Sequence, residues 1–310
     1  MKFSGRTWVA IAVLVSAGGI GLGLYQRARI LAASPTAMLQ RLPARNAITL
    51  FLDFNALRQS GVLKLVSPTK ATEEPEYQTF VRATGFDYRR DLDLAAASFS
   101  NDGEFFVIKG RFDWNKLNAY AIAQGGTCED RLCRMPGSTP QRRISFFPVQ
   151  SNLMALAVSG DSLAAMRLAH TEAAGLAVQL LDPPLDPVWL SIPADSLKTT
   201  DRLPSGTRAF ATALASADKI LLSLGPQGQQ LEARLAVTCR TAVDAAALTA
   251  QLQRVTAVLQ EMIARENQRP DPKDLSGVLT AGVFQQAGRR VMGRWPLPPV
   301  FLESLAGGAL

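Results

Sequence analysis

The sequence predicts an α+β protein: an N-terminal transmembrane helix, followed by antiparallel hairpins that alternate with helices. Three observations support this prediction. Residues 7–25 form an uncharged apolar run, turn residues such as 101–103 (Asn-Asp-Gly) separate pairs of strand-like segments, and these hairpins alternate with helix-like segments along the chain. With 310 residues, 47% hydrophobic and 19% charged, the composition is that of a folded chain.

The apolar run is the first predicted element. Residues 7–25 read TWVAIAVLVSAGGIGLGLY, and nineteen helical residues span roughly 28 Å, enough for the hydrocarbon core of a bilayer. A cleaved signal peptide is an alternative, although bulky and basic residues follow the run where a peptidase needs small ones. A buried core helix is the third possibility. We therefore expect an uncleaved anchor that contacts membrane lipid.

The orientation of this anchor follows from the lengths of chain on either side. Basic residues flank both ends of the run, so charge does not decide the direction. Residues 1–6 are a short tail, expected in the cytoplasm of a bacterium, and the long C-terminal body is expected on the periplasmic side of the cytoplasmic membrane. Gly19 and Gly23 form a GxxxG pair that could let two such helices pack closely.

Residues 26–46 are predicted to be a connector, because Pro35 and Pro43 disfavour one continuous helix from the membrane into the body. Residues 47–180 form the first α+β half. It begins with a strand at 47–54 (AITLFLDF) and a short helix at 55–61. The rest is predicted as a helix at 76–84, a hairpin at 92–100 and 104–111, a helix at 114–123, a hairpin at 144–149 and 153–158, and a helix at 161–170.

Three prolines break the chain in the linker at 181–187 (LDPPLDP), and the order then restarts in the second half, 188–310. We predict a strand at 188–192, helices at 194–198 and 208–216, a hairpin at 220–224 and 231–239, a helix at 243–265, a hairpin at 278–284 and 290–294, and a helix at 299–305. In the long helix one apolar stripe is expected, formed by Leu248, Leu252, Val255, Leu259 and Met262. The shared element order suggests two pseudo-repeats.

Cysteine usage is consistent with an exported body. Cys128 and Cys133 lie in the polar stretch GGTCEDRLC, where a local disulfide would close a loop. Two free thiols are the alternative. Together with Cys239 and His170 these residues match no common zinc-site spacing.

The basic character of the chain does not indicate nucleic-acid binding. Of 33 basic residues, six precede the first acidic residue, Asp53, and the rest of the chain contains 27 basic and 26 acidic residues. The formal charge of +7 therefore belongs to the flanks of the apolar run, and the body is nearly neutral. Basic doublets interleaved with aromatic residues, as a base-stacking groove requires, do not occur.

We find no catalytic, cofactor-binding or metal-ligating set. With one histidine the chain cannot build a HExxH motif, and no GxSxG elbow, P-loop or Rossmann fingerprint occurs outside the apolar run. The richest polar cluster comprises Asp87, Arg89, Arg90, Asp91 and Asp93. Asp91 and Asp93 would lie on one side of a strand, where they could hold a hard cation or act as an acid and base pair, but the adjacent arginines favour ion pairing.

The segments GFDYRRDLD (85–93) and LPARNAITLFLDFNAL (42–57) resemble an uncharacterised family of bacterial membrane-anchored exported proteins. The resemblance covers about the first third of the chain. It implies a signal anchor and an exported body, and it transfers no activity and no site residues.

The expectation is a single-pass, membrane-anchored protein that acts outside the cytoplasm as a binding, scaffold or assembly module with a protein partner. The alternatives are an anchored hydrolase or transferase that uses Asp87, Asp91 or Asp93, and an accessory subunit of a larger membrane complex.

Overall fold

The body folds around one antiparallel sheet, which confirms the predicted α+β class. A computed structural model describes residues 33–66, 74–139, 141–171, 184–193, 196, 205–215, 217–228 and 230–306. Within this part of the chain, no helix is long and apolar enough to cross a membrane. The predicted anchor at 7–25, with Gly19 and Gly23, lies outside the described residues.

In the first half, aspartates fix the starts of several helices. The side chains of Asp53, Asp87 and Asp113 accept hydrogen bonds from backbone N–H groups in the first turns of the helices that follow them. The elements are α2 (Pro35–Arg41), β1 (Ile48–Asp53), α3 (Phe54–Gln59), α4 (Val62–Val66), α5 (Pro75–Thr84), α6 (Tyr88–Asp91), β2 (Leu92–Ser100), β3 (Gly103–Gly110), α7 (Trp114–Ala123), β4 (Thr127–Glu129), β5 (Leu132–Pro136), β6 (Arg143–Gln150), β7 (Leu153–Ser159) and α8 (Ala164–His170).

In the second half, a capping box between Thr241 and Asp244 begins the longest described helix. Its inner side buries Leu248 and Leu252, as predicted, whereas Met262 is 54% exposed near the end of the helix. The elements are β8 (Val188–Pro193), α9 (Ser205–Leu214), β9 (Lys219–Gln227), β10 (Gln230–Thr238), α10 (Ala242–Arg265), α11 (Leu275–Thr280), β11 (Val283–Ala287), β12 (Arg290–Leu297) and α12 (Pro299–Ala306).

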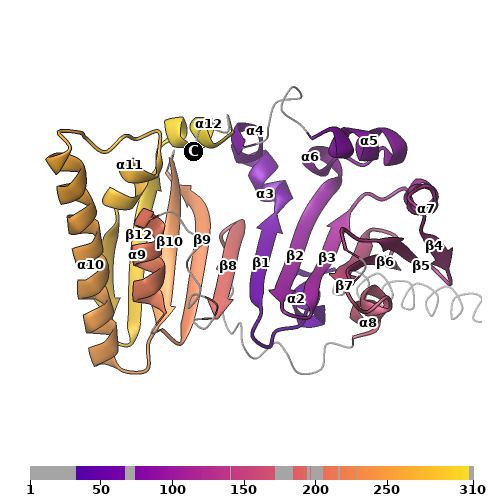
Figure 1. The fold of residues 1–310 in the computed structure, drawn as a ribbon, viewed down its shortest axis with the longest axis horizontal. Helices are drawn as coiled ribbons and strands as arrows, with labels where there is room; N and C mark the ends of the chain where they lie inside the picture. The colour runs from indigo at the N-terminus through magenta and orange to yellow at the C-terminus, as the bar shows by residue number, and fades with distance from the viewer. Residues whose placement is uncertain are drawn as a thin grey trace, which may run out of the picture.

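The strand order is the same on both sides of the centre of the sheet. The described strands form one twelve-stranded sheet in the order β11-β12-β10-β9-β8-β1-β2-β3-β7-β6-β5-β4, with every neighbouring pair antiparallel (Figure 1). Reading outward, β1-β2-β3-β7-β6 matches β8-β9-β10-β12-β11. The hairpin β4–β5 extends the first half beyond this common pattern.

The two halves meet at β1 and β8. Phe51 pairs with Trp189 across the two strands, and their rings stack with centroids 5.5 Å apart. Trp189 is only 1% exposed. The backbone N–H of Asp53 also donates to the carbonyl of Pro187, just before β8 begins. The halves therefore share one sheet and a packed junction.

Helices α2 and α8 of the first half cover the face of the sheet opposite to the one that α9 and α10 cover in the second half. Phe51 belongs to a core with Met38 of α2 and Leu168 of α8. Its neighbour Leu52 packs against a second core, which includes Leu252 of α10. Because successive strand residues point to opposite faces, the two cores lie on opposite sides of the sheet. Figure 1 shows α9 and α10 in front of the strands of the second half.

One predicted strand begins later than expected. Residues 278–280 belong to α11, and the strand starts at Val283. The helix forms because the side chain of Asp274 accepts hydrogen bonds from the backbone N–H groups of Ser276 and Gly277. This cap outweighs the β-like composition of the next residues.

The stretch predicted as a loop around Cys128 is a hairpin. Strands β4 and β5 pair through the register Cys128↔Cys133, and a disulfide joins these two cysteines. Asp130 and Arg131 form the tight turn with positive φ angles. Cys133 packs with Leu117 and Ala121 of α7, so the hairpin is attached to the body. Cys239 is a buried free cysteine.

Replacing both Cys128 and Cys133 by Ser is expected to lower the free energy of unfolding by about 2 kcal/mol, because the disulfide restricts a six-residue loop in the unfolded chain. Urea unfolding of the full chain in detergent, with and without reductant, measures this effect. Reductant should destabilise the wild type and leave the double variant unchanged. A double variant that reductant still destabilises would contradict the assignment, because Cys239 has no disulfide to lose.

Candidate functional site

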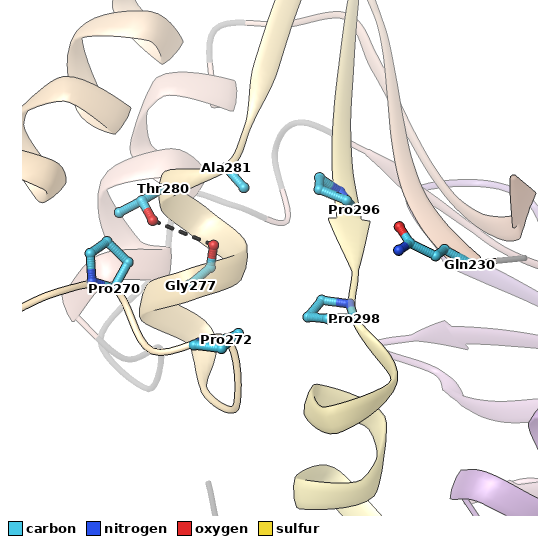
Figure 2. A pocket seen from close by; sticks show the side chains of 8 residues that line it. All are labelled: Gln230, Pro270, Pro272, Gly277, Thr280, Ala281, Pro296 and Pro298. Atoms are coloured by element: carbon cyan, nitrogen blue, oxygen red, sulfur yellow. Dashed lines mark hydrogen bonds between the residues drawn. The ribbon is translucent and has the colours of Figure 1, made fainter.

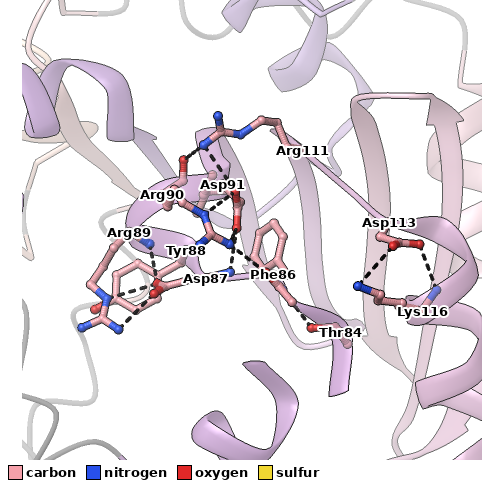
Figure 3. Close-up of polar contacts among 12 residues, drawn as sticks. Thr84, Phe86, Asp87, Tyr88, Arg89, Arg90, Asp91, Arg111, Asp113 and Lys116 are labelled. Carbon is pink, nitrogen blue, oxygen red and sulfur yellow. Dashed lines mark hydrogen bonds and ion pairs between the residues drawn. The ribbon is translucent and has the colours of Figure 1, made fainter. Parts of the chain in front are cut away.

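The predicted polar cluster borders a cavity at one end of the first half. We call it the Asp91 cleft: a cavity of about 470 Å³ between the segment 84–91, the segment 110–116 and the β6–β7 turn. Arg90, Arg111 and Lys116 supply its positive charges, and Phe86 and Phe112 its aromatic surface. Figure 3 shows Arg90 and Arg111 on either side of Asp91, with Asp113 and Lys116 forming a separate pair.

Asp91 holds the two arginines of the cleft in position. Its carboxylate accepts two hydrogen bonds from Arg90, at 2.7 and 3.0 Å, and one from the backbone N–H of Asp87 at 3.0 Å. Arg111 Nη2 lies 3.3 Å from the same carboxylate. The hydrogen bonds from Arg90 lower the pKa of Asp91, with further help from the Asp87 backbone and from Arg111. Asp91 is therefore an anion that orients two arginines.

Asp87 has a structural role beside the cleft. It caps α6, and its carboxylate forms an ion pair with Arg89 at 3.1 Å and accepts a hydrogen bond from the Tyr77 hydroxyl at 3.0 Å. Burial alone would raise the pKa of Asp87, but the hydrogen bonds from Arg89 and Tyr77 outweigh it and the pKa is lowered. Burial and the bond to Asp87 raise the pKa of Tyr77.

The expectation that Asp91 and Asp93 share one side of a strand is wrong. Asp91 is the last residue of α6, and Asp93 lies at a bulge where the pairing of β2 with β3 shifts between Leu92 and Leu94. The Asp93 carboxylate forms an ion pair with Arg58 of α3 at 3.2 Å. The ion pairing favoured by the neighbouring arginines is present for Asp87 and Asp91.

Arg111 and Lys116 are site residues that the sequence pattern did not indicate. Arg111 reaches Asp91 because Leu92 pairs with Gly110, so that the next residues outward lie together, and Arg111 N–H donates to the Asp91 carbonyl at 2.8 Å. An unbroken register from the turn would place Phe112 there instead. The one-residue bulge therefore decides which side chain completes the cleft.

Two glycines permit this close packing. A Cβ at Gly110 would lie 2.4 Å from the backbone carbonyl oxygen of Asp91, so a side chain there would separate the two segments of the cleft. Gly85 has a φ of +73° and ends α5. Its carbonyl accepts from Arg90 at 2.8 Å, and a Cβ added there would be 3.7 Å from Lys116 Nζ. Gly85 thus marks where two of the cations converge.

The chemistry of the cleft favours binding over proton transfer. A general acid or base needs a pKa near the working pH, whereas the pKa values of Asp87 and Asp91 are lowered and Asp93 is ion-paired with Arg58. Within the described residues no group of three or more His, Cys, Asp or Glu side chains could hold a metal ion. The exposed arginine and lysine donors remain the groups available to a ligand.

Asp87 and Asp91 are expected to make the fold sensitive to acid. Their folded pKa values are lowered, so their contribution is present above the unfolded value of about 3.9 and is lost as the pH falls below about 4. The urea concentration at the midpoint of unfolding, measured from pH 7 to pH 3, should decrease below about pH 4. This decrease should be smaller for Asp91→Asn than for the wild type. Asp102→Asn, on an exposed turn, should show the same decrease as the wild type. Parallel curves for wild type and Asp91→Asn would contradict this reasoning.

Two other cavities are less informative. One of about 370 Å³ is lined by four prolines, 270, 272, 296 and 298, with Gln230 and Thr280 as polar side chains (Figure 2). Another, of about 420 Å³, borders Arg41, whose Nη1 donates to the carbonyl of Ala169 at 2.7 Å and so caps α8. Burial lowers the pKa of Arg41. The first cavity has no lysine or arginine in its lining, and the second balances Arg41 and Arg167 with Asp102 and Asp161.

Comparison with known proteins supports the fold. Crystal form I of TP0453 matches with a TM-score of 0.50 and 10% identity, over 87% of this chain and 97% of that chain. Crystal form III matches with a TM-score of 0.50 and 9% identity, over 87% and 98%. No protein-family model and no curated protein sequence matches. At this identity the likeness concerns the architecture alone, which extends over nearly the whole of both chains.

Proposed function

We propose that the chain is a single-pass, membrane-anchored binding or assembly module, exported to the periplasmic side of a bacterial cytoplasmic membrane, whose protein partner engages the Asp91 cleft. The observation that carries this proposal is the composition of the cleft. Its rim holds Arg90 and Arg111, each 65% exposed at the side chain, and Lys116, 58% exposed. The carboxylate between the two arginines is 10% exposed and serves to orient them.

The anchor part of the proposal is supported by residues 7–25 and by the charge distribution. An uncharged run of nineteen residues is long enough to span a bilayer, and the body that follows is nearly neutral. The disulfide between Cys128 and Cys133 suits an oxidising compartment. The repeated strand order further supports an origin by internal duplication, with β4–β5 as an addition to the first half.

A carboxylate-dependent hydrolase or transferase is less well supported. Asp87, Asp91 and Asp93 are each ion-paired with an arginine. The lowered pKa values of Asp87 and Asp91 make these carboxylates weak bases that stay ionised, which suits neither a general acid nor a general base at neutral pH.

Placement and binding are tested separately in cells. Protease added to intact spheroplasts is expected to digest the body while a cytosolic control survives. Protection of the body until lysis would contradict the placement. For binding, a photo-crosslinker is installed at exposed Asn115, in the first turn of α7 beside the cleft.

Arg111→Glu should greatly reduce the adduct formed from position 115, and Arg294→Glu should leave it unchanged. Arg294 is a matched control because it is exposed on β12, in the other half. Equal adduct yields in the two variants would contradict a partner at the Asp91 cleft.

A further inference from the structure

We infer that the Asp91 cleft binds a single carboxylate attached to an apolar group, such as an Asp or Glu side chain next to an aromatic residue in a partner protein. This inference rests on the proposed function, because it names the chemistry by which the partner would be recognised. It is carried by three features of the cleft: its net charge, its unused hydrogen-bond donors and its aromatic wall.

The net charge selects a monoanion. Arg90, Arg111 and Lys116 contribute three positive charges, and Asp91 and Asp113 two negative ones, so the lining carries a net charge of +1. One carboxylate neutralises this charge. A phosphate monoester, with about −1.5 to −2 charges near neutral pH, would leave the cleft negative. Charge complementarity therefore favours the carboxylate.

Several hydrogen-bond donors of the cleft have no hydrogen-bond partner among the described residues. Arg90 bonds Asp91 and Gly85 through Nε and Nη2, and its Nη1 has no hydrogen-bond partner among the described residues. Arg111 uses Nη2 for Asp91 and the Arg90 carbonyl, which leaves its Nε and Nη1 without partners in the same part of the chain. Lys116 Nζ is 3.6 Å from Asp113, close enough for an ion pair but long for a hydrogen bond. Ordered donors of this kind bind an anion at little entropic cost.

The aromatic wall accounts for the apolar group. The Phe86 and Phe112 rings stack at 5.4 Å and both line the cleft. Phe112 also contacts Trp114, whose indole N–H donates to the carbonyl of Ser151 at 2.9 Å and connects this wall to the β6–β7 turn. Figure 3 shows Phe86 near the Asp91 carboxylate and its arginines. A ligand held by its carboxylate would therefore place its adjacent side chain against fixed rings.

The test uses the full-length protein in detergent and isothermal titration with three capped dipeptides: acetyl-Phe-Asp-amide, acetyl-Phe-Asn-amide and acetyl-Phe-phosphoserine-amide. The Asp peptide is expected to bind at least about tenfold more tightly than the isosteric Asn peptide, because only the carboxylate forms charge-assisted hydrogen bonds. Raising the salt concentration should weaken the Asp peptide selectively. The phosphoserine peptide should bind no more tightly than the Asp peptide.

Variants locate the effect. Arg111→Gln and Lys116→Gln should each weaken the Asp peptide about five- to twentyfold and leave the Asn peptide unchanged. Arg294→Gln, far from the cleft on β12, should bind both peptides as the wild type does. Circular dichroism of each variant verifies that it is folded.

Several results would overturn the inference: equal binding of the Asp and Asn peptides, tighter binding of the phosphoserine peptide, or an equal loss in Arg294→Gln. Phenylacetate separates two sources of the carboxylate, because it lacks peptide groups. It should bind at least about tenfold more weakly than the Asp dipeptide. If phenylacetate binds more tightly than the Asp dipeptide, the ligand is a small aromatic acid and not a protein partner.

The crosslinking and titration results together separate this inference from the proposed function. If the crosslink from position 115 depends on Arg111 while the Asp peptide fails to bind, the proposed function stands and the ligand class is wrong. If the Asp peptide binds through Arg111 while the crosslink does not depend on that residue, the ligand class stands and a protein partner at the cleft is wrong.

Discussion

Trp189→Ala is expected to lower the free energy of unfolding by about 3–5 kcal/mol, the usual cost of removing a fully buried large aromatic side chain. Trp189 is 1% exposed and stacks on Phe51 at the junction of β8 with β1. The substitution leaves a cavity at the only strand pair that joins the two halves of the described sheet. Urea unfolding of the full chain, followed by circular dichroism, measures the change.

A matched control and a milder variant sharpen this first prediction. Val258→Ala, on the exposed side of α10 and 47% exposed, should change the free energy of unfolding by less than about 0.5 kcal/mol. Trp189→Phe keeps most of the ring stack and should cost less than Trp189→Ala. A loss below about 1 kcal/mol for Trp189→Ala would contradict a packed junction. Two separate unfolding transitions in the wild type would contradict a single cooperative sheet.

Arg234→Met is expected to lower the free energy of unfolding by about 2–4 kcal/mol, after allowance for partial exposure, because it leaves two nearly buried carboxylates without their counterion. Arg234 Nη1 lies 2.6 Å from Asp186 and Nε 2.9 Å from Glu232. The side chains of these acids are 14% and 13% exposed. Gly225 leaves room for Asp186, since a Cβ there would be 2.0 Å from its Oδ1.

The cross-strand neighbour of Arg234 provides the control for this second prediction. Arg294 pairs with Arg234 in the register of β10 and β12 but is exposed, so Arg294→Met should cost less than about 0.5 kcal/mol. Adding Asp186→Asn to Arg234→Met should restore part of the loss, because one uncompensated charge is removed. Equal effects of Arg234→Met and Arg294→Met would show that the ion pairs contribute little. Unfolding curves of the four proteins measured at pH 7 decide the matter.

Much of the secondary structure could be predicted from local patterns. The turn at 101–103 predicts the hairpin of β2 and β3, and the alternation of hairpins with helices predicts an antiparallel α+β fold. Asp113 and Asp161 both precede helices. The Asp161 carboxylate accepts a hydrogen bond from the backbone N–H of Leu163, one residue before α8 begins. Such signals are local, because a turn or a cap depends on residues within about four positions of each other.

The candidate site could be predicted only in part from such patterns. Asp87, Arg89, Arg90 and Asp91 are neighbours in sequence, and their ion pairs could be anticipated. Arg111 and Lys116 enter the cleft through the register of β2 with β3, and a one-residue bulge at Asp93 sets that register. No periodicity marks such a bulge, because it is stabilised by contacts between separate segments.

The sequence by itself determined most of the hairpins and helices, though not the β4–β5 hairpin or α11, and also where the apolar run at 7–25 lies and that the body is nearly neutral. Only the tertiary structure decided the twelve-strand order, which face of the sheet each helix covers, and the placing of Arg90, Arg111 and Lys116 in the lining of one cleft. The physical reason is the separation along the chain of the residues that interact. Turns, caps and periodicity arise from neighbouring residues, whereas strand order and the composition of the cleft arise from packing between residues far apart in the chain.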